Sequence, residues 1–295
     1  MKVVVFTELK WSLYRVYTDI ARYLPDYEFK FINWSKWGDD ELKDQFDECD
    51  IFITSPGAFD IIKHLNHSKI LIISHGFEDI QCRIMNKDYT HAITSNSIRN
   101  LFPSDINLFL TPNGVDSQQF DYKLLNGQLD TIGWCGATNV WYKQPHWARE
   151  IAKQTNTTFK LTSGVPCEDD FSKWTPLGYE QIREWYSTID LLLITSIPEE
   201  KHETGPLPAF EAIVSGVPVI GTPVGNFANV PGPKFTTIEE GIEIVNQLKS
   251  DPERMKTLAK EQYDYVMANG TYPSFAHKWR EAFEHVSSLK DGSSL

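Results

Sequence analysis

Short, strongly apolar segments that alternate with helical segments are the feature that most limits the folds this chain can adopt. In the first part of the chain six such segments recur, at residues 2–6, 28–33, 51–55, 69–74, 91–95 and 107–111. Near-continuous apolar runs are typical of parallel strands that are covered on both faces. Residues 13–24 carry apolar side chains at helical spacing and are followed by Pro25. The pattern predicts parallel βαβ units.

The alternation restarts after a turn-rich stretch at 111–116 and a polar run at 121–130. Four more strands are expected at 131–134, 158–162, 191–195 and 218–221, separated by helical patterns at 147–153 and 179–187. A final helix is expected at 272–287, with Pro273 at its start and one apolar face made of Phe275, Trp279, Ala282, Phe283 and Val286. We therefore predict an α/β protein of two Rossmann-like domains, 1–112 and 113–272.

Composition excludes several classes of protein. A chain of 295 residues with 41% hydrophobic residues has enough material for two cores, and no segment approaches the roughly 18 apolar residues of a membrane span. The four cysteines lie far apart, without zinc-site spacing or disulfide density, and are expected to be reduced. A net charge of −12 opposes non-specific attraction to nucleic acid or anionic membranes. We expect a cytoplasmic protein without integral membrane association.

Ligands of open parallel sheets bind at the carboxyl ends of the strands. In the second domain this rule selects the turns at 133–137, 163–165 and 221–225 and the long loop after 191–196. Small residues dominate the three turns, and Gly136, Ser163 and Gly164 are candidate donor-binding residues.

The long loop carries two glutamates, Glu203 and Glu211, around a Gly/Pro turn that leads into a helix. The start of a helix offers backbone N–H groups and a positive dipole end to an anionic diphosphate. Carboxylates in the same place accept hydrogen bonds from hydroxyl groups, such as those of a sugar or a ribose. The alternative is structural: Glu211 complements the helix dipole and Glu203 is a solvated loop charge.

The stretch ETGPLPAFEAIVSGVPVIGTPVG, which begins at Glu203, resembles the donor-site signature of retaining GT-B glycosyltransferases of family 4. Three other segments resemble family features in the expected order: TPNGVD at 111–116 with Phe120, the segment 179–196, and the helix that contains Trp279. The first domain matches loosely, through 74–76 and 94–96. The resemblance implies two Rossmann-like domains whose parallel sheets face an interdomain cleft, with residues 273–295 returning to the first domain.

The resemblance also implies roles for single residues. Glu203 would contact the hydroxyls of the donor sugar, Glu211 the ribose, and the N–H groups of Gly205 and Leu207 the sugar or the β-phosphate. Trp134 and Cys135 occupy the region where the family usually places an arginine, which leaves Lys143 as the evident cation against the diphosphate. His75 would face the cleft and bond the transferring sugar; alternatively it is bonded locally in a loop.

The implied reaction is transfer with retained anomeric configuration from a UDP- or GDP-type sugar, which is a co-substrate, with no other cofactor. No Asp-x-Asp sequence stands beside a strand end, so no metal site is implied. Positioning and leaving-group electrostatics would supply most of the rate.

The acceptor is expected at aromatic and basic loops of the first domain, which include Lys10, Trp11, Tyr14, Trp34 and Trp37. Aromatic faces stack on sugar rings and on nucleobases, but such side chains are often packing residues. A saccharide or lipid-linked glycan is the commoner acceptor in the family. Hydroxymethylated cytosine in DNA is the alternative, and its backbone would then be tracked by Lys10, Arg15, Lys36 and Arg83.

The sequence also bears on two other functions. A nicotinamide-dependent dehydrogenase needs a glycine-rich turn after the first strand, and residues 6–11 contain no glycine. A non-catalytic nucleotide-sugar-binding module stays open because the family arginine is absent.

Overall fold

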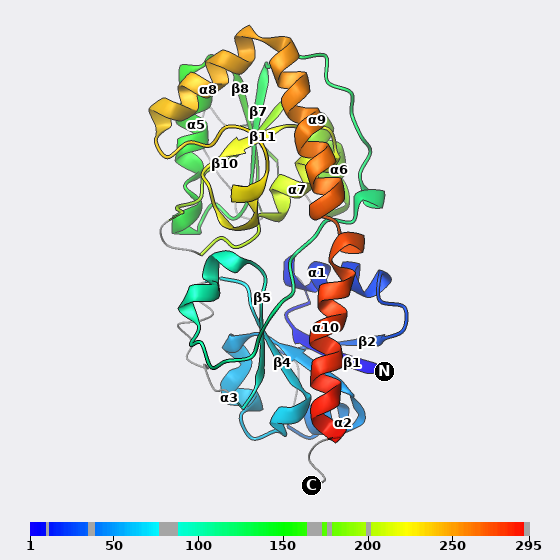
Figure 1. The fold of residues 1–295 in the computed structure, drawn as a ribbon. Coiled ribbons are helices and arrows are strands. Elements are labelled where there is room, and N and C mark those ends of the chain that lie inside the picture. Colours follow the sequence, from blue (N-terminus) through cyan, green and yellow to red (C-terminus); the bar gives the residue numbers. More distant parts are fainter. Residues whose placement is uncertain are drawn as a thin grey trace. The chain divides into compact units, whose positions relative to one another are not determined.

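The computed structural model describes residues 1–9, 12–34, 39–76, 88–163, 173–175, 179–198 and 202–291. Two compact units make up the chain (Figure 1). The first contains residues 1–114 and the C-terminal segment from Tyr272, and the second is Val115–Thr271.

The first unit contains a six-stranded, all-parallel sheet in the order β2-β1-β3-β4-β5-β6. Its strands are β1 (Lys2–Thr7), β2 (Glu28–Asn33), β3 (Ile51–Thr54), β4 (Ile70–Ser74), β5 (Thr90–Ile93) and β6 (Leu108–Leu110). Its helices are α1 (Ser12–Arg22), α2 (Asp39–Glu48), α3 (Phe59–Ile62) and α10 (Tyr272–Asp291). The buried β1, β3 and β4 are the apolar runs that the sequence analysis identified as strands.

The C-terminal helix α10 packs on the first unit, against α1, β3, β4 and β6 (Figure 1). Trp279 is fully buried, and its indole N–H donates to the carbonyl of Pro112 at 3.2 Å. The Trp279 ring also meets Tyr17 of α1 edge-on, with 6.1 Å between ring centroids. The expected apolar face of this helix is therefore the face that it buries.

The second unit contains a five-stranded parallel sheet in the order β11-β10-β7-β8-β9. Its strands are β7 (Thr131–Cys135), β8 (Thr158–Thr162), β9 (Lys173–Thr175), β10 (Leu191–Ile194) and β11 (Val219–Gly221). Its helices are α5 (Pro145–Gln154), α6 (Tyr179–Ser187), α7 (Leu207–Val214), α8 (Ile238–Ser250) and α9 (Pro252–Asn269). The predicted α/β class with two parallel sheets is confirmed, and β9 is an edge strand that the sequence analysis did not predict.

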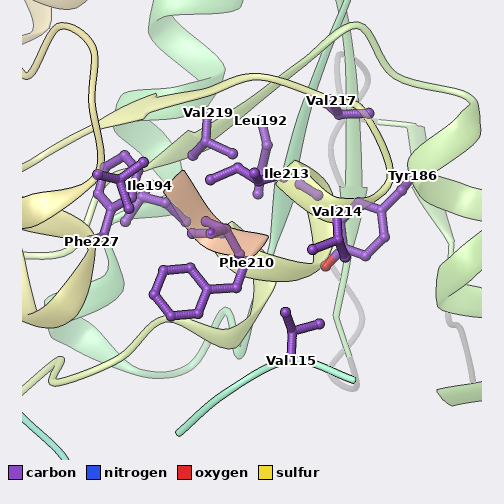
Figure 2. Close-up of a cluster of buried hydrophobic side chains, with 14 of the residues drawn as sticks. Val115, Tyr186, Leu192, Ile194, Phe210, Ile213, Val214, Val217, Val219 and Phe227 are labelled. Carbon is purple, nitrogen blue, oxygen red and sulfur yellow. The ribbon is translucent and has the colours of Figure 1, made fainter. Parts of the chain in front are cut away.

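Successive side chains of β10 enter different cores, because side chains alternate across a strand. Leu192 and Ile194 belong to a cluster with Ile213 and other residues of α6 and α7, part of which Figure 2 shows. Leu191 and Leu193 belong to a second cluster with residues of α5 and α8. Burial of each of these side chains contributes about 1.5–3 kcal/mol. This double-sided core fixes the strand ends on which the candidate site is built.

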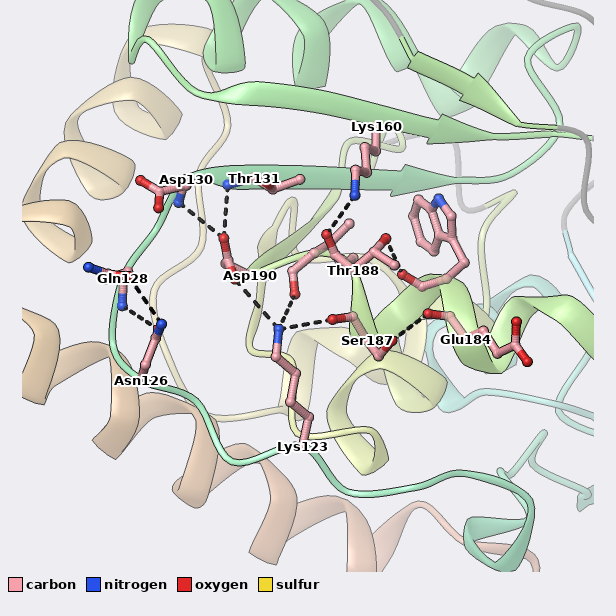
Figure 3. Close-up of polar contacts among 12 residues, drawn as sticks. Lys123, Asn126, Gln128, Asp130, Thr131, Lys160, Glu184, Ser187, Thr188 and Asp190 are labelled. Atoms are coloured by element: carbon pink, nitrogen blue, oxygen red, sulfur yellow. Dashed lines mark hydrogen bonds and ion pairs between the residues drawn. The ribbon is translucent and has the colours of Figure 1, made fainter.

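A polar cluster ties together the opposite, amino-terminal end of the sheet (Figure 3). The Lys123 ammonium donates to the carbonyl of Ser187 at 3.0 Å, at the end of α6, and lies 3.7 Å from the Asp190 carboxylate. Asp190 in turn accepts hydrogen bonds from the backbone N–H groups of Asp130 and Thr131 at 3.1 and 2.9 Å. The cluster joins the segment 121–130, which precedes β7, to α6, β7 and β10.

Candidate active site at the carboxyl edge of the second sheet

The loops after β7 and β10 are joined by hydrogen bonds. The Thr195 hydroxyl lies 2.8 Å from the carbonyl of Lys143 and 2.9 Å from that of Gln144, and it accepts the indole N–H of Trp134 at 3.0 Å. The Ile197 N–H donates to the Tyr142 carbonyl at 2.8 Å. These bonds hold the short helix η5 (Trp141–Lys143) against the end of β10. Lys143 is therefore positioned by a strand end.

Lys143 and Glu203 form an ion pair at this edge. Their side chains are 22% and 12% exposed, and the Ser196 hydroxyl lies 3.5 Å from the Glu203 carboxylate. Burial by itself would lower the pKa of Lys143, but the Glu203 carboxylate outweighs it and raises the pKa above its ordinary value. The ammonium is consequently charged at neutral pH, beside a small pocket that Ser196 and Pro206 also line.

The Glu203 loop is held in place by a close backbone contact. Asn226 donates its N–H to the Thr204 carbonyl at 2.8 Å. Its neighbour Gly225 has a φ of 46°, and a Cβ at that position would lie 2.2 Å from the same carbonyl oxygen. Only glycine combines this left-handed conformation with so close an approach. The glycine-containing turn after β11 therefore fixes the backbone next to Glu203.

Helix α7 starts beside Glu203, with Pro206 as its N-cap and Leu207 as its first residue. The Ala209 N–H donates to the Pro206 carbonyl at 2.9 Å, and Pro208 has no N–H. Leu207 therefore supplies the first-turn N–H that has no intrahelical acceptor. Gly205 precedes this helix start and is partly exposed.

Glu211 is the fifth residue of α7, not a residue of its first turn. It is 2% exposed, and the Tyr186 hydroxyl of α6 donates to its carboxylate at 2.8 Å. The structural alternative for Glu211, in which its carboxylate complements the helix dipole from the first turn, is therefore wrong, because the helix already begins at Leu207, four residues before Glu211. Glu211 is a buried, hydrogen-bonded carboxylate instead.

Gly136 and Ser163 lie at the ends of β7 and β8, at the same edge of the sheet. The Gly136 N–H donates to the Thr162 carbonyl at 3.2 Å, and the Ser163 hydroxyl accepts the Thr138 N–H at 3.3 Å. A Cβ on Gly136 would lie 3.4 Å from a carbon of the Lys143 side chain. Gly164 lies outside the described residues. Trp134, expected in the region of the family arginine, is a buried strand residue.

His75 follows β4 and belongs to the first unit. Its Nε2 lies 3.1 Å from the hydroxyl of the buried Tyr17, and burial lowers the pKa of His75 to about 4. The imidazole is therefore neutral at pH 7. This partner belongs to α1, 58 positions away in the sequence, so it is not the bond within the loop that the alternative describes. The role of His75 toward a sugar stays a prediction.

Two of the five predicted acceptor residues are described. Tyr14 meets Phe31 edge-on at 5.1 Å between ring centroids, and Trp34 meets Phe6 edge-on at 6.3 Å. Both rings are partly buried, so they pack within their own unit and keep some exposed surface. Arg15 lies 4.0 Å from Asp19 of the same helix. Lys10, Trp11, Lys36, Trp37 and Arg83 lie outside the described residues.

Sequence reasoning missed three side chains that support the candidates: Tyr17 beside His75, Tyr186 beside Glu211, and Thr195 between the loops. Tyr17 and Tyr186 lie on helices at positions that a hydrophobic pattern assigns to the core, and a pattern does not show that their hydroxyls reach a distant histidine or carboxylate. Thr195 is the last residue of the predicted strand at 191–195 and directly follows the observed β10, so its place at the ligand-binding end of a strand was a usable signal.

Among the described residues, no group of three or more His, Cys, Asp or Glu side chains is arranged to hold a metal ion. Every described helix falls short of the length and apolarity that crossing a lipid bilayer requires.

The fold is that of GT-B glycosyltransferases. AviGT4, a glycosyltransferase involved in avilamycin A biosynthesis, has a TM-score of 0.67 to this chain and 13% identity, over 98% of both chains. HepE from Anabaena, in complex with UDP and glucose, has a TM-score of 0.74 and 13% identity over 96% of this chain and 99% of its own.

An α-glucosyltransferase in complex with UDP and a 13-mer DNA containing a HMU base has a TM-score of 0.71 and 10% identity, over 97% of this chain and 99% of its own. No protein-family model and no curated protein sequence matches the chain.

Proposed function

We propose that this protein is a glycosyltransferase that moves a sugar from a nucleoside-diphosphate sugar of the UDP or GDP type to a hydroxyl group of an acceptor. The Lys143–Glu203 pair, at the carboxyl edge of the second sheet and beside the start of α7, carries the proposal. It places a cation, a carboxylate and helix N–H groups together, which are the groups that a sugar diphosphate requires.

Each group has a proposed task toward the donor. The Lys143 ammonium neutralises charge on the diphosphate, and the N–H groups of Gly205 and Leu207 donate hydrogen bonds to the sugar or the β-phosphate. Glu203 accepts hydrogen bonds from the hydroxyls of the sugar. Glu211, oriented by the Tyr186 hydroxyl at 2.8 Å, binds the ribose. Gly136 and Ser163, at the ends of β7 and β8, contact the donor from the neighbouring turns. The complexes of HepE with UDP, glucose and UDP-glucose support a nucleotide-sugar ligand for this fold.

The proposed chemistry retains anomeric configuration and needs no metal. The acceptor oxygen bonds to the anomeric carbon on the face from which the diphosphate leaves, the bond between that carbon and the phosphate oxygen breaks, and the hydroxyl proton passes to the departing phosphate. Lys143 stabilises the negative charge that develops there. His75, neutral at pH 7 because its pKa is about 4, bonds the transferring sugar as a neutral donor or acceptor.

A saccharide or lipid-linked glycan is the proposed acceptor, with Lys10, Trp11, Tyr14, Trp34 and Trp37 as its candidate contacts. The partly exposed rings of Tyr14 and Trp34 support stacking on a sugar. DNA that contains a hydroxymethylated base is a second candidate acceptor. The similarity to the DNA-bound α-glucosyltransferase over 97% of this chain favours it, and the net charge of −12 opposes it.

The proposal is tested by incubating the protein with UDP- and GDP-sugars and with two kinds of acceptor, oligosaccharides and hydroxymethylcytosine DNA. Mass spectrometry of the acceptors should show a gain of one sugar. Glu203→Ala should abolish turnover while largely keeping nucleotide affinity, and Glu253→Ala, an exposed carboxylate of α9, is the matched control.

Nucleotide binding without any transfer would favour the non-catalytic module instead. Unchanged transfer by Glu203→Ala would contradict the assignment of the donor site to Glu203 and its neighbours.

A further inference from the structure

An exposed aromatic side chain stands next to the candidate site. Trp141 is 60% exposed. Its ring meets the imidazole of His202 nearly at right angles, with 5.4 Å between centroids and 78° between planes. The same imidazole stacks on Tyr142 at 4.9 Å and 16°. Trp141, Tyr142 and His202, here termed the aromatic shelf, form a corner of rings from which most of the Trp141 surface remains open.

Two residues of the shelf are chain neighbours of the Lys143–Glu203 pair. Tyr142 precedes Lys143 in the chain, and the Lys143 ammonium lies 5.7 Å from the centre of the Tyr142 ring. His202 precedes Glu203. The Tyr142 carbonyl also accepts the Ile197 N–H at 2.8 Å, so the shelf is anchored to the loop after β10. Trp141 stands on the same short helix η5 as Lys143, so the shelf neighbours the charged pair through Tyr142 and His202.

We propose that the aromatic shelf binds a sugar ring of a saccharide acceptor, and this inference rests on the proposed function. A pyranose presents a face of C–H groups that packs on an aromatic ring, and its hydroxyls remain at the edge. An exposed indole held at a fixed angle by a neighbouring imidazole is suited to such a ligand, because the ring loses little freedom when the ligand binds.

The order of sugar, ribose and base along the donor places its nucleobase away from the aromatic shelf. The proposed donor runs from its sugar at Glu203 to its ribose at Glu211, on the second turn of α7, and the base extends beyond the ribose. The shelf adjoins Glu203 instead, and so lies beside the transferred sugar. The ring that occupies it is thus expected at the sugar end of the donor and not at its nucleotide end.

The direct test follows the Trp141 indole N–H by nuclear magnetic resonance of ¹⁵N-tryptophan-labelled full-length protein. The signal that disappears in Trp141→Phe belongs to Trp141. UDP is added first, then maltotriose or N-acetylglucosamine, and in a separate sample a 13-mer DNA with hydroxymethylcytosine. We expect a saccharide added after UDP to shift this signal, while UDP alone leaves it within the line width.

Each other result overturns the proposal. A shift with UDP alone would make the shelf a nucleobase site, a shift with DNA alone would make it a base-binding site for nucleic acid, and no shift with any probe would remove the subsite. Calorimetric titration of the protein with UDP separates failure of the subsite from failure of the proposed function. Measurable UDP binding without a saccharide-induced shift of Trp141 would contradict the subsite alone, whereas absence of UDP binding would contradict the proposed function.

Transfer kinetics give a second readout for a saccharide that is modified. Trp141→Ala should raise the KM for that acceptor about tenfold, as expected for loss of one aromatic contact, and should change the KM for the donor less than about twofold. Trp141→Phe should restore most of the acceptor affinity. Tyr122→Ala, which removes an exposed aromatic ring packed on Tyr263, is the matched control. An unchanged acceptor KM in Trp141→Ala would contradict the proposal.

Discussion

At the scale of single residues, the candidate site depends on how the charges of Lys143 and Glu203 are stabilised where both side chains are largely buried. The Lys143 ammonium is costly to bury, and the Glu203 carboxylate compensates by raising its pKa. A diphosphate that enters the pocket would offer Lys143 a second anionic partner. The pair is thus expected to act as a unit, in which removal of either member leaves the other with an uncompensated charge.

Lys143→Met should lower kcat about 10²-fold, because one preorganised charge at the leaving group is lost. The matched control is Lys153→Met on α5, which removes an exposed ammonium and should leave turnover unchanged. Steady-state kinetics with a UDP-sugar donor checks the prediction. Equal rates for the two variants would show that Lys143 does not stabilise the leaving group.

His75 makes stability depend on pH in a defined window. Its folded-state pKa of about 4 lies below the ordinary 6.5, so between these values the unfolded chain binds a proton that the folded protein does not. Stability should therefore fall as the pH drops from 6.5 toward 4, and His75→Asn should weaken this dependence. Urea unfolding at pH 7 and pH 4.5 measures it, with the exposed His64→Asn as control. The same pH dependence in the wild type and in His75→Asn would contradict this account of the histidine.

At the scale of elements, the carboxyl edge of the second sheet keeps its geometry because strands, loops and α7 are held to one another by short-range contacts. Sequence patterns predicted the strands β7, β8, β10 and β11 and the turns that follow them, because apolar runs and glycines are local signals. They did not predict that Thr195 joins two loops or that Tyr186 reaches Glu211, since these contacts join residues 52 and 25 positions apart.

Gly225→Ala should disturb the Glu203 loop. Its Cβ would collide with the Thr204 carbonyl, and alanine disfavours a φ of 46°. We expect a loss of about 1–3 kcal/mol in the free energy of unfolding and weaker nucleotide binding. Gly57→Ala is the matched control, because a Cβ there would meet no atom nearer than 3.8 Å. Denaturant unfolding and calorimetry measure both effects, and wild-type values for Gly225→Ala would show that the loop tolerates a side chain.

Lys123→Met should weaken the amino-terminal end of the same sheet. It leaves the carbonyl of Ser187 without its ammonium partner and Asp190 without its neighbouring charge, for a loss of about 1–3 kcal/mol. Lys256→Met removes only an exposed pair with Glu253 and should cost less than about 0.5 kcal/mol. Urea unfolding of both variants compares them. Equal stabilities would mean that the cluster in Figure 3 contributes little.

At the scale of the whole molecule, the chain is two parallel α/β units, and the first is completed by a helix from the far end of the sequence. The periodic apolar runs predicted both sheets, and the apolar face of α10 was visible at Phe275, Trp279 and Phe283. That pattern indicates that one face of the helix is buried, but it does not identify the residues against which the face packs. The contact of Trp279 with Pro112 and Tyr17 joins segments more than 150 residues apart and needed the structure.

Trp279→Ala should destabilise the first unit by about 3–5 kcal/mol, because it opens a cavity under α10 where the indole is fully buried. Hydrogen exchange followed by mass spectrometry should show faster exchange in α1 and β4 and a smaller change in β7 and β10. Equal acceleration in both units would contradict their description as separate compact bodies.

We infer that the edge formed by Lys143, Glu203 and the start of α7 binds the donor. A crystal structure of the protein soaked with UDP-glucose tests it most directly. Diphosphate oxygens are expected within hydrogen-bond distance of the Lys143 ammonium and the Leu207 N–H, with a sugar hydroxyl at Glu203 and the ribose at Glu211. A nucleotide bound elsewhere, with Lys143 still paired to Glu203 alone, would contradict it.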